Sequence, residues 1–188
     1  MSTSAIIGIV IAVVLFSIVA IAISIYNSLV KSKNSVEKAF SDLDVVFKKR
    51  YDLVPNLVNT VKGYMKHEAD LLTKTTELRA DAMKSQNLND TVVKNKELSS
   101  RIRNIFAISE NYPKLMANQN FLSLQEQLTK IEDEIARQRS EYNNCVTEHN
   151  NKIETFPKNI FAKMFGFKSF ELFVVTDPKE REVVKVEF

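Results

Sequence analysis

The sequence has few residues that interrupt or cross-link a fold. Its 188 residues include three glycines, four prolines and a single cysteine, Cys145. One cysteine excludes a disulfide within the chain and suits a reducing compartment. The shortage of glycine and proline, together with the lack of any low-complexity segment or repeat, predicts long helices. We therefore expect an all-α fold.

Neither sign of charge dominates the chain. It carries 26 lysines and arginines against 23 aspartates and glutamates, a net charge of +3. A general nucleic-acid binder would show a one-sided basic excess, so we expect no nucleic-acid partner. The sequence also lacks a P-loop and a G-x-S-x-G motif, and it has too little glycine for loops that cradle phosphates. These absences predict a protein that is not an enzyme and has no cofactor and no small-molecule substrate.

The first thirty residues contain no charged side chain. Within them, Ala5 to Ile25 is almost entirely Ile, Val, Ala and Leu. As a helix this run would span about 30 Å, the thickness of the hydrocarbon core of a bilayer. A secretory signal would begin with basic residues and be shorter, whereas here the first charge, Lys31, follows the run. We predict a retained transmembrane helix, with a cleaved signal as the alternative.

Basic residues lie on only one side of this segment. Lys31, Lys33 and Lys38 follow it closely, and no lysine or arginine precedes it. The positive-inside rule then predicts that the amino terminus lies outside and that the domain after the span lies in the cytoplasm.

The rest of the chain shows the spacing of amphipathic helices. Apolar residues recur three and four positions apart within residues 34–51, 55–84, 91–112 and 120–155. Helices of this kind joined by short connections pack side by side in alternating directions. We therefore predict that the transmembrane helix is followed by an elongated antiparallel four-helix bundle with coiled-coil-like packing.

Pro55 decides where the first helix of this bundle should end. Its ring clashes with the carbonyl group four residues earlier, and it disfavours helical conformation at the residue before it. We interpret Tyr51 to Val54 as a tight turn between two helices. The alternative is one continuous helix with a kink at the proline.

This pattern divides the chain into three parts. Residues 1–30 form the transmembrane segment, residues 31–157 the helical bundle, and residues 158–188 a segment rich in Phe and Lys with a carboxyl-terminal tail. Residues 170–176 and 183–188 in the tail have the composition of β-strands. The tail is therefore either a small hairpin or an extended segment that becomes ordered on a partner.

A cluster of polar and aromatic residues lies at the predicted turn. Its members are Lys49, Arg50, Tyr51, Asp52, Pro55 and Asn56. One interpretation is a solvated end of the bundle. The other is a docking surface for a partner, because protein interfaces are enriched in arginine and tyrosine.

Phenylalanines and lysines alternate after the last long helix. The candidate residues are Phe161, Lys163, Phe165, Phe167 and Lys168. If four helices alternate in direction, this segment returns to the membrane, where the aromatic rings would enter the interface and the lysines would face anionic lipids. The alternative is that these phenylalanines cover the end of the bundle as part of its core.

Two histidines are the candidates for a metal site. His67 is followed by Glu68, but the second histidine of an H-E-x-x-H zinc motif is missing. His67 and His149 could still meet beside carboxylates in a bundle, so a metal-dependent factor stays as an alternative. We predict that neither binds a metal. Cys145 falls on the apolar stripe of its helix and is interpreted as a small buried hydrophobe.

Four stretches of the sequence carry a family resemblance. They are KRYDLVPNLVNTVKGYMKHE (residues 49–68), ENYPKLMANQNFLSLQEQL (110–128), IARQRSEYNNCVTEHNNKIETFP (135–157) and MFGFK (164–168). In this order, and after an apolar amino-terminal span, they resemble the LemA family. The resemblance implies a bacterial single-pass protein of the inner membrane with a long four-helix bundle and a poorly defined biochemical role. It supplies no catalytic residues.

These observations favour a membrane-anchored scaffold or adaptor. The long faces of such a bundle would be presented to other copies in a homo-oligomer or to another membrane protein. The resemblance makes a membrane protease a candidate partner, since family genes often lie near those of membrane proteases. A lipid-surface sensor acting through the segment rich in Phe and Lys is the first alternative. A metal-dependent factor using histidine and carboxylate side chains is the second.

Overall fold

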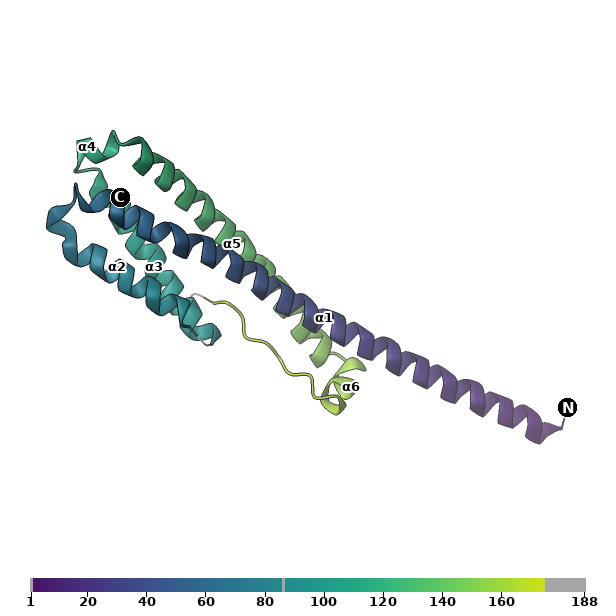
Figure 1. Cartoon of the computed structure of the whole chain (residues 1–188). Coiled ribbons are helices and arrows are strands. Elements are labelled where there is room, and N and C mark those ends of the chain that lie inside the picture. The colour runs from purple at the N-terminus through teal and green to yellow at the C-terminus, as the bar shows by residue number, and fades with distance from the viewer. Residues whose placement is uncertain (1, 86, 175–188) are drawn as a thin grey trace, which may run out of the picture. The chain divides into compact units, whose positions relative to one another are not determined.

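The computed structural model describes residues 2–85 and 87–174 (Figure 1). Its elements, in order, are α1 (Thr3–Lys62), the 3-10 helix η1 (Lys66–Glu68), α2 (Ala69–Met83), α3 (Leu88–Ser109), α4 (Pro113–Met116), α5 (Gln119–Glu154) and α6 (Lys158–Met164). No β-strand occurs in the residues described. The expectation of an all-helical fold is therefore confirmed for this part of the chain.

The chain forms two units that share two long helices. Among the described residues, unit 1 comprises residues 2–41 and 141–172, and unit 2 comprises residues 42–85, 87–140 and 173–174. Both α1 and α5 therefore contribute one part to each unit. These units cut across the sequence boundaries at residues 30 and 157, because each half of a long helix packs with a different set of neighbours. The three-part division of the sequence stays a prediction.

α1 has two different surfaces along its length. The large apolar residues between Ile6 and Ile23 are all at least half exposed, and Phe16 is 76% exposed. From Ile25 onward, buried residues recur every three or four positions, as on a helix with one face in a core. By length and apolar composition, α1 is the one helix in the described residues that could cross a membrane.

In unit 1, the first part of α1 packs against α5 and α6. Ser32 of α1 is hydrogen-bonded to His149 of α5, and the ring of Phe40 lies 5.9 Å from that of Tyr142. Because a later residue of α1 pairs with an earlier residue of α5, the two helices run antiparallel here.

In unit 2, buried apolar residues come from the second part of α1 and from four further helices. They are Leu43, Val46, Phe47, Val54, Leu57 and Val61 of α1, Leu72 and Ala82 of α2, Val92, Leu98, Ile102 and Ile105 of α3, Leu115 of α4, and Phe121, Leu128, Ile131 and Ile135 of α5. Their three- and four-residue spacing explains why these segments are helical and which face of each is buried. α2 and α3 lie side by side (Figure 1).

The predicted turn at Tyr51 to Val54 is wrong. α1 continues through Pro55 to Lys62, so the alternative of an unbroken helix is the observed one. A proline inside a helix has no N–H group to donate to the carbonyl four residues earlier, which here belongs to Tyr51. Arg79 of α2 replaces that donor, because its Nε atom donates a hydrogen bond to the Tyr51 carbonyl oxygen at 2.6 Å.

The chain turns after Lys62 instead. Residues 63–65 are not helical, and η1 follows before α2 begins at Ala69, so the single helix expected over residues 55–84 is interrupted. Glycine lowers helix stability by about 1 kcal/mol relative to alanine, which favours a break at Gly63. The contact between Tyr51 and Arg79 shows that α1 and α2 are antiparallel on either side of this turn.

Two further expectations change at the ends of elements. α3 begins three residues earlier than expected, since the side-chain oxygen of Asn87 accepts a hydrogen bond from the backbone N–H of Asp90 and caps the helix. Residues 170–174 are irregular rather than a β-strand. The rest of the tail, residues 175–188, lies outside the described residues, so the choice between a hairpin and an extended segment stays open.

We expect the bond from Arg79 to be worth most when Pro55 is present. Arg79→Ala should lower the free energy of unfolding by about 1–3 kcal/mol, because it leaves the half-buried Tyr51 carbonyl without a donor. In a Pro55→Ala background the N–H of the new alanine takes over this carbonyl, so the same substitution should cost clearly less. Denaturant unfolding of the full chain in detergent, followed by circular dichroism, measures both values.

Arg101→Ala is the matched control for this cycle. Arg101 makes only a partly exposed pair with Glu97 one helical turn away, and its loss should cost less than about 1 kcal/mol in either background. An equal cost of Arg79→Ala with and without Pro55 would show that this arginine does not compensate for the proline.

Candidate functional site

The most unusual side chain of unit 2 is Arg50, a charged residue that is completely buried. It lies on α1 between the apolar positions Phe47 and Val54, on the face that packs against α3 and α5. Its Nη1 atom donates to Ser99 Oγ at 2.6 Å and to Glu132 Oε1 at 2.7 Å. Buried charges are tolerated only when paired and hydrogen-bonded in this way.

Asn95 of α3 completes the surroundings of this guanidinium group. Its side-chain oxygen accepts a hydrogen bond from Arg50 Nη2 and another from the hydroxyl of Tyr51 at 2.8 Å. Burial raises the pKa of Tyr51, and the bond to Asn95 opposes that effect. Arg50, Tyr51, Asn95, Ser99 and Glu132 thus form one polar network, which we call the Arg50 network. It joins α1, α3 and α5 inside an apolar core.

A cavity of about 390 Å³ lies beside the Arg50 network. Phe173 covers part of it: its ring is 6.2 Å from that of Phe47, and the guanidinium group of Arg139 lies 4.9 Å from its centre. The Nε atom of Arg50 is buried and has no hydrogen-bond partner in the described residues. A polar space of this size can hold water molecules. The polar groups of the network pair with one another, which suits positioning of helices.

The remaining residues of the predicted docking cluster are more accessible. Lys49 pairs with Glu134 at 3.2 Å on the surface, Asp52 and Asn56 are exposed, and Pro55 is half-buried. Because α1 continues to Lys62, these residues do not lie at a turn, which corrects the interpretation of a bundle tip. A docking role for the exposed members stays a prediction. Arg50 and Tyr51 are instead part of the interior.

In unit 1, the segment rich in Phe and Lys packs against α1. Phe161 and Phe167 are partly buried against Ile25, Leu29 and Ala162. Phe165 is exposed but its ring meets that of Tyr26 edge to face at 4.9 Å. Lys163 and Lys168 are exposed. The five predicted interface residues are therefore divided between an inner set that serves as core and an outer set that is accessible.

Sequence reasoning missed three exposed apolar residues, two in this segment and one just before it. Phe156 is 79% exposed, Ile160 56% and Met164 64%. Ile160 and Met164 are one helical turn apart on α6, which is the signal that could have revealed them as neighbours on one face, and Phe156 lies in the turn just before that helix. Phe161 and Phe167 face inward, so the phenylalanines of α6 and the residues after it do not show by themselves which side of the helix is exposed.

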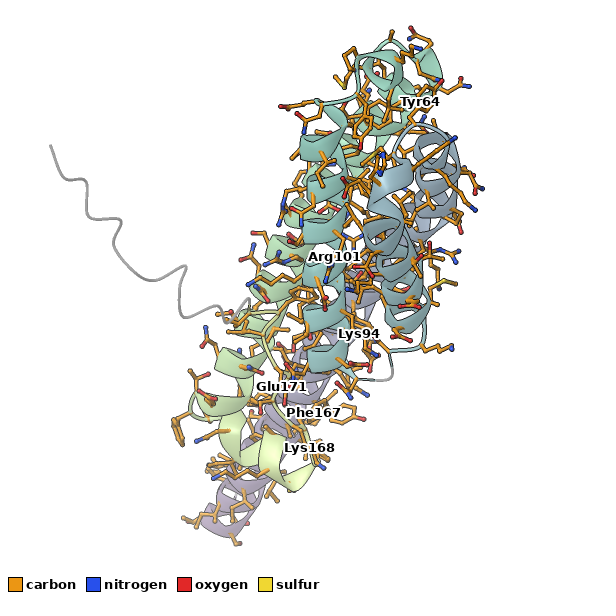
Figure 2. The ribbon with its side chains drawn as sticks, turned by 90° about the vertical axis from the view of Figure 1, so that its left-hand side faces the viewer. Tyr64, Lys94, Arg101, Phe167, Lys168 and Glu171 are labelled. Carbon is orange, nitrogen blue, oxygen red and sulfur yellow. The ribbon has the colours of Figure 1, made fainter. Side chains whose placement is uncertain are left out.

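The chain after α6 is held by side chains of α5. Asn150 uses its amide to accept from the backbone N–H of Phe170 at 3.0 Å and to donate to the Phe170 carbonyl at 2.9 Å. The hydroxyl of Tyr142 donates to the carbonyl of Glu171 at 3.0 Å. These side chains supply the partners that a neighbouring strand would otherwise provide, so the segment is ordered without a β-sheet. Figure 2 shows Lys168 and Glu171 on this segment.

We call the contacts of Tyr142, His149 and Asn150 with the backbone of residues 168–171 the clasp. His149 contributes to it as follows. Its Nε2 atom lies 3.1 Å from the carbonyl oxygen of Lys168, and its Nδ1 atom lies 3.0 Å from Ser32 Oγ. A carbonyl can only accept, so Nε2 carries the proton in this bond. Both ring nitrogens are thus occupied inside a buried site. His67, by contrast, is exposed on η1.

The remaining candidates for chemistry are a metal site and the thiol of Cys145. In residues 2–85 and 87–174 there is no group of three or more His, Cys, Asp or Glu side chains that could hold a metal ion. Cys145 is half-buried rather than fully buried as expected. Burial and the neighbouring carboxylate of Glu141 raise the pKa of its thiol, which disfavours the nucleophilic thiolate at neutral pH.

We expect the Arg50 network to matter for stability far more than the surface pair next to it. Arg50→Met keeps the aliphatic part of the side chain but removes the buried charged donor of Ser99, Glu132 and Asn95, so it should lower the free energy of unfolding by about 3 kcal/mol. Lys49→Met removes only the exposed pair with Glu134 and should cost less than about 1 kcal/mol. Denaturant unfolding of the full chain in detergent compares the two. Equal costs would contradict the structural role of the network.

Comparison with known proteins places these features in a family. The model of the LemA family matches residues 39–188. Protein LemA of Metamycoplasma hominis is 27% identical over 161 residues, which cover 84% of this chain and 72% of that protein. The magnetosome proteins MamQ 1 and MamQ 2 of Paramagnetospirillum magneticum are each 23% identical over 174 residues, 79% of this chain and 64% of theirs.

The chain therefore spans less than two thirds of either MamQ protein. The part of this chain that the family model matches includes the Arg50 network, the turn after α1, the part of α5 from Tyr142 to Asn150 and all of α6. The chain belongs to the LemA family.

Proposed function

We propose that this protein is a membrane-anchored helical scaffold or adaptor. The observation that carries the proposal is the character of α1. One uninterrupted helix presents an exposed apolar surface from Ile6 to Ile23 and then supplies core residues to the rest of the chain. An exposed apolar run of this length is favourable in lipid and unfavourable in water. Membrane attachment and the helical domain are thus built on the same element.

The helical domain is proposed to act as an antiparallel four-helix bundle with coiled-coil-like packing. Support comes from unit 2, where α1, α2, α3 and α5 contribute buried residues at three- and four-residue spacing. The antiparallel contact between α1 and α2 agrees with this arrangement. A bundle held by a buried polar network offers long, charged outer faces for a partner rather than an active site.

We further propose that the span crosses the inner membrane of a bacterium with its amino terminus outside and the helical domain in the cytoplasm. The lysines that follow the span support this orientation, since none precedes it. The partner is proposed to be a second copy of the chain or another membrane protein, such as a membrane protease. The names of the MamQ relatives, which are magnetosome proteins, also fit a role at a membrane.

Two other functions are alternatives to the scaffold role. A lipid-surface sensor is favoured by one specific observation, the exposed apolar side chains around α6. A metal-dependent factor has weaker support, because both ring nitrogens of His149 already have protein partners.

The orientation predicts which cysteine a membrane-impermeant maleimide can reach. Cys145 is the only native cysteine, so in spheroplasts it should react only after permeabilisation. A cysteine introduced by Ser2→Cys in a Cys145→Ser background should react in intact spheroplasts. Labelling at mildly alkaline pH offsets the raised pKa of the Cys145 thiol. Denatured protein serves as the reactivity control, and the reverse labelling pattern would contradict the orientation.

The scaffold role predicts a stable complex in the membrane. Cross-linking of lysines in membranes, followed by gentle detergent extraction, should capture the chain with itself or with a membrane protein. Co-expression of two differently tagged copies separates these cases, because only self-association lets one tag recover the other. Mixing singly tagged extracts after solubilisation controls for association in detergent. A monodisperse monomer that captures no partner would count against the proposal.

A further inference from the structure

α6 and the turn before it expose an apolar stripe on the outside of unit 1. Its members are Phe156, Ile160 and Met164, which are more than half exposed. We call this set the α6 stripe. Three large apolar side chains exposed within nine consecutive residues are unfavourable in water, and exposed apolar surface larger than scattered single residues usually marks a binding face.

The α6 stripe is separate from the side of α6 that packs in the core. The opposite side of α6 already packs on α1, where Ala162 is buried against Ile25 and Leu29 and is joined by Phe161. Among the described residues, α6 therefore has apolar side chains on two sides: the inner ones pack on α1, while Ile160 and Met164 stay more than half exposed. An exposed apolar face opposite a buried one is expected to have a cover of its own.

The place of α6 along α1 indicates what covers the second face. α6 contacts α1 at Ile25 and Leu29, immediately after the exposed apolar run ends at Ile23. The ring of Tyr26, which is 42% exposed, lies beside Phe165 at the same level. Aromatic residues at the end of an apolar span are typical of the boundary between lipid tails and headgroups. The α6 stripe thus continues the lipid-facing surface of α1.

The charges around α6 fit a lipid headgroup layer. Between Thr155 and Phe170 the sequence has three lysines, Lys158, Lys163 and Lys168, and no acidic residue. Lys163 and Lys168 are exposed. On the same unit, Lys31 and Lys152 line a hollow with Ser24 and Asn27 at the end of the apolar run. Lysines in such positions attract the phosphates of anionic lipids while their stems lie along apolar surface.

We propose that α6 is a second membrane contact, which lies in the interface of the bilayer that α1 crosses. Phe156, Ile160 and Met164 enter the boundary of the acyl chains, and the lysines face the headgroup phosphates. The occupant of the stripe is a phospholipid leaflet. The inference rests on the proposed function in one respect, since it requires α1 to span the same membrane. It adds that the helical domain is attached to the leaflet at two places.

The chain has no tryptophan, so single substitutions provide clean fluorescent reporters. The full chain carrying Met164→Trp or Phe156→Trp is reconstituted in vesicles of phosphatidylcholine and phosphatidylglycerol, with lipids brominated either near the headgroup or near the chain end. Both reporters should be blue-shifted and quenched most strongly by bromines near the headgroup. Acrylamide in the water should quench them weakly.

Two further reporters serve as controls. Phe16→Trp lies in the middle of the apolar run and should be quenched most strongly by bromines near the chain end. Met83→Trp replaces an exposed residue of α2 and should respond to acrylamide rather than to brominated lipid. All four replaced side chains are more than half exposed, so the substitutions leave the core unchanged.

The outcomes separate the two proposals. If Phe16→Trp is quenched by brominated lipid while Met164→Trp and Phe156→Trp are quenched only by acrylamide, the span is correct and the second contact is overturned. If the stripe reporters are blue-shifted but insensitive to both quenchers, a second copy of the chain covers the stripe, which also overturns the lipid assignment. If Phe16→Trp itself is insensitive to brominated lipid, the proposed transmembrane anchor fails.

Discussion

The buried guanidinium group of Arg50 is the constraint on which the interior of unit 2 depends. A guanidinium group buried away from solvent needs hydrogen-bond acceptors on several sides. Here Ser99 and Asn95 of α3 and Glu132 of α5 supply these acceptors. Apolar residues could pack in several registers, whereas these hydrogen bonds require Arg50 to lie opposite its acceptors on α3 and α5. The network therefore contributes specificity of packing as much as stability.

The same stretch of α1 lacks one backbone hydrogen bond, and a side chain of α2 supplies the missing donor. Pro55 deprives the Tyr51 carbonyl of its usual donor, and Arg79 replaces it from α2. Tyr51 then uses its hydroxyl to reach Asn95 on α3. A single turn of α1 thus has polar contacts with α2, α3 and α5. This explains how one helix can run from an exposed apolar surface into a core without ending at its proline.

In unit 1, side chains of α5 hold residues 168–171, which have no regular secondary structure, by hydrogen bonds to their backbone. Tyr142, His149 and Asn150 lie on one face of α5 and satisfy the backbone of residues 168–171. This clasp fixes the chain that leaves α6, while Ala162 and Phe161 fix α6 itself on α1. The consequence is that the outer face of α6, with its apolar stripe and lysines, is presented in a defined direction. A flexible tail of the same composition would not be presented in this way.

Composition and local spacing by themselves determined that the protein is helical, that α1 carries an apolar run long enough to span a bilayer, and which face of each helix is buried. These properties depend on residues within a turn or two of each other, so they can be predicted from the sequence. Tertiary structure decided that Pro55 lies inside a helix, that Arg50 is buried, that Phe161 faces inward and Ile160 outward, and that residues 170–174 are held without a strand. Each of these depends on a partner distant in sequence, such as Arg79 for Tyr51 or Asn150 for Phe170. Local propensity does not predict a hydrogen bond between residues that come together only when the chain folds.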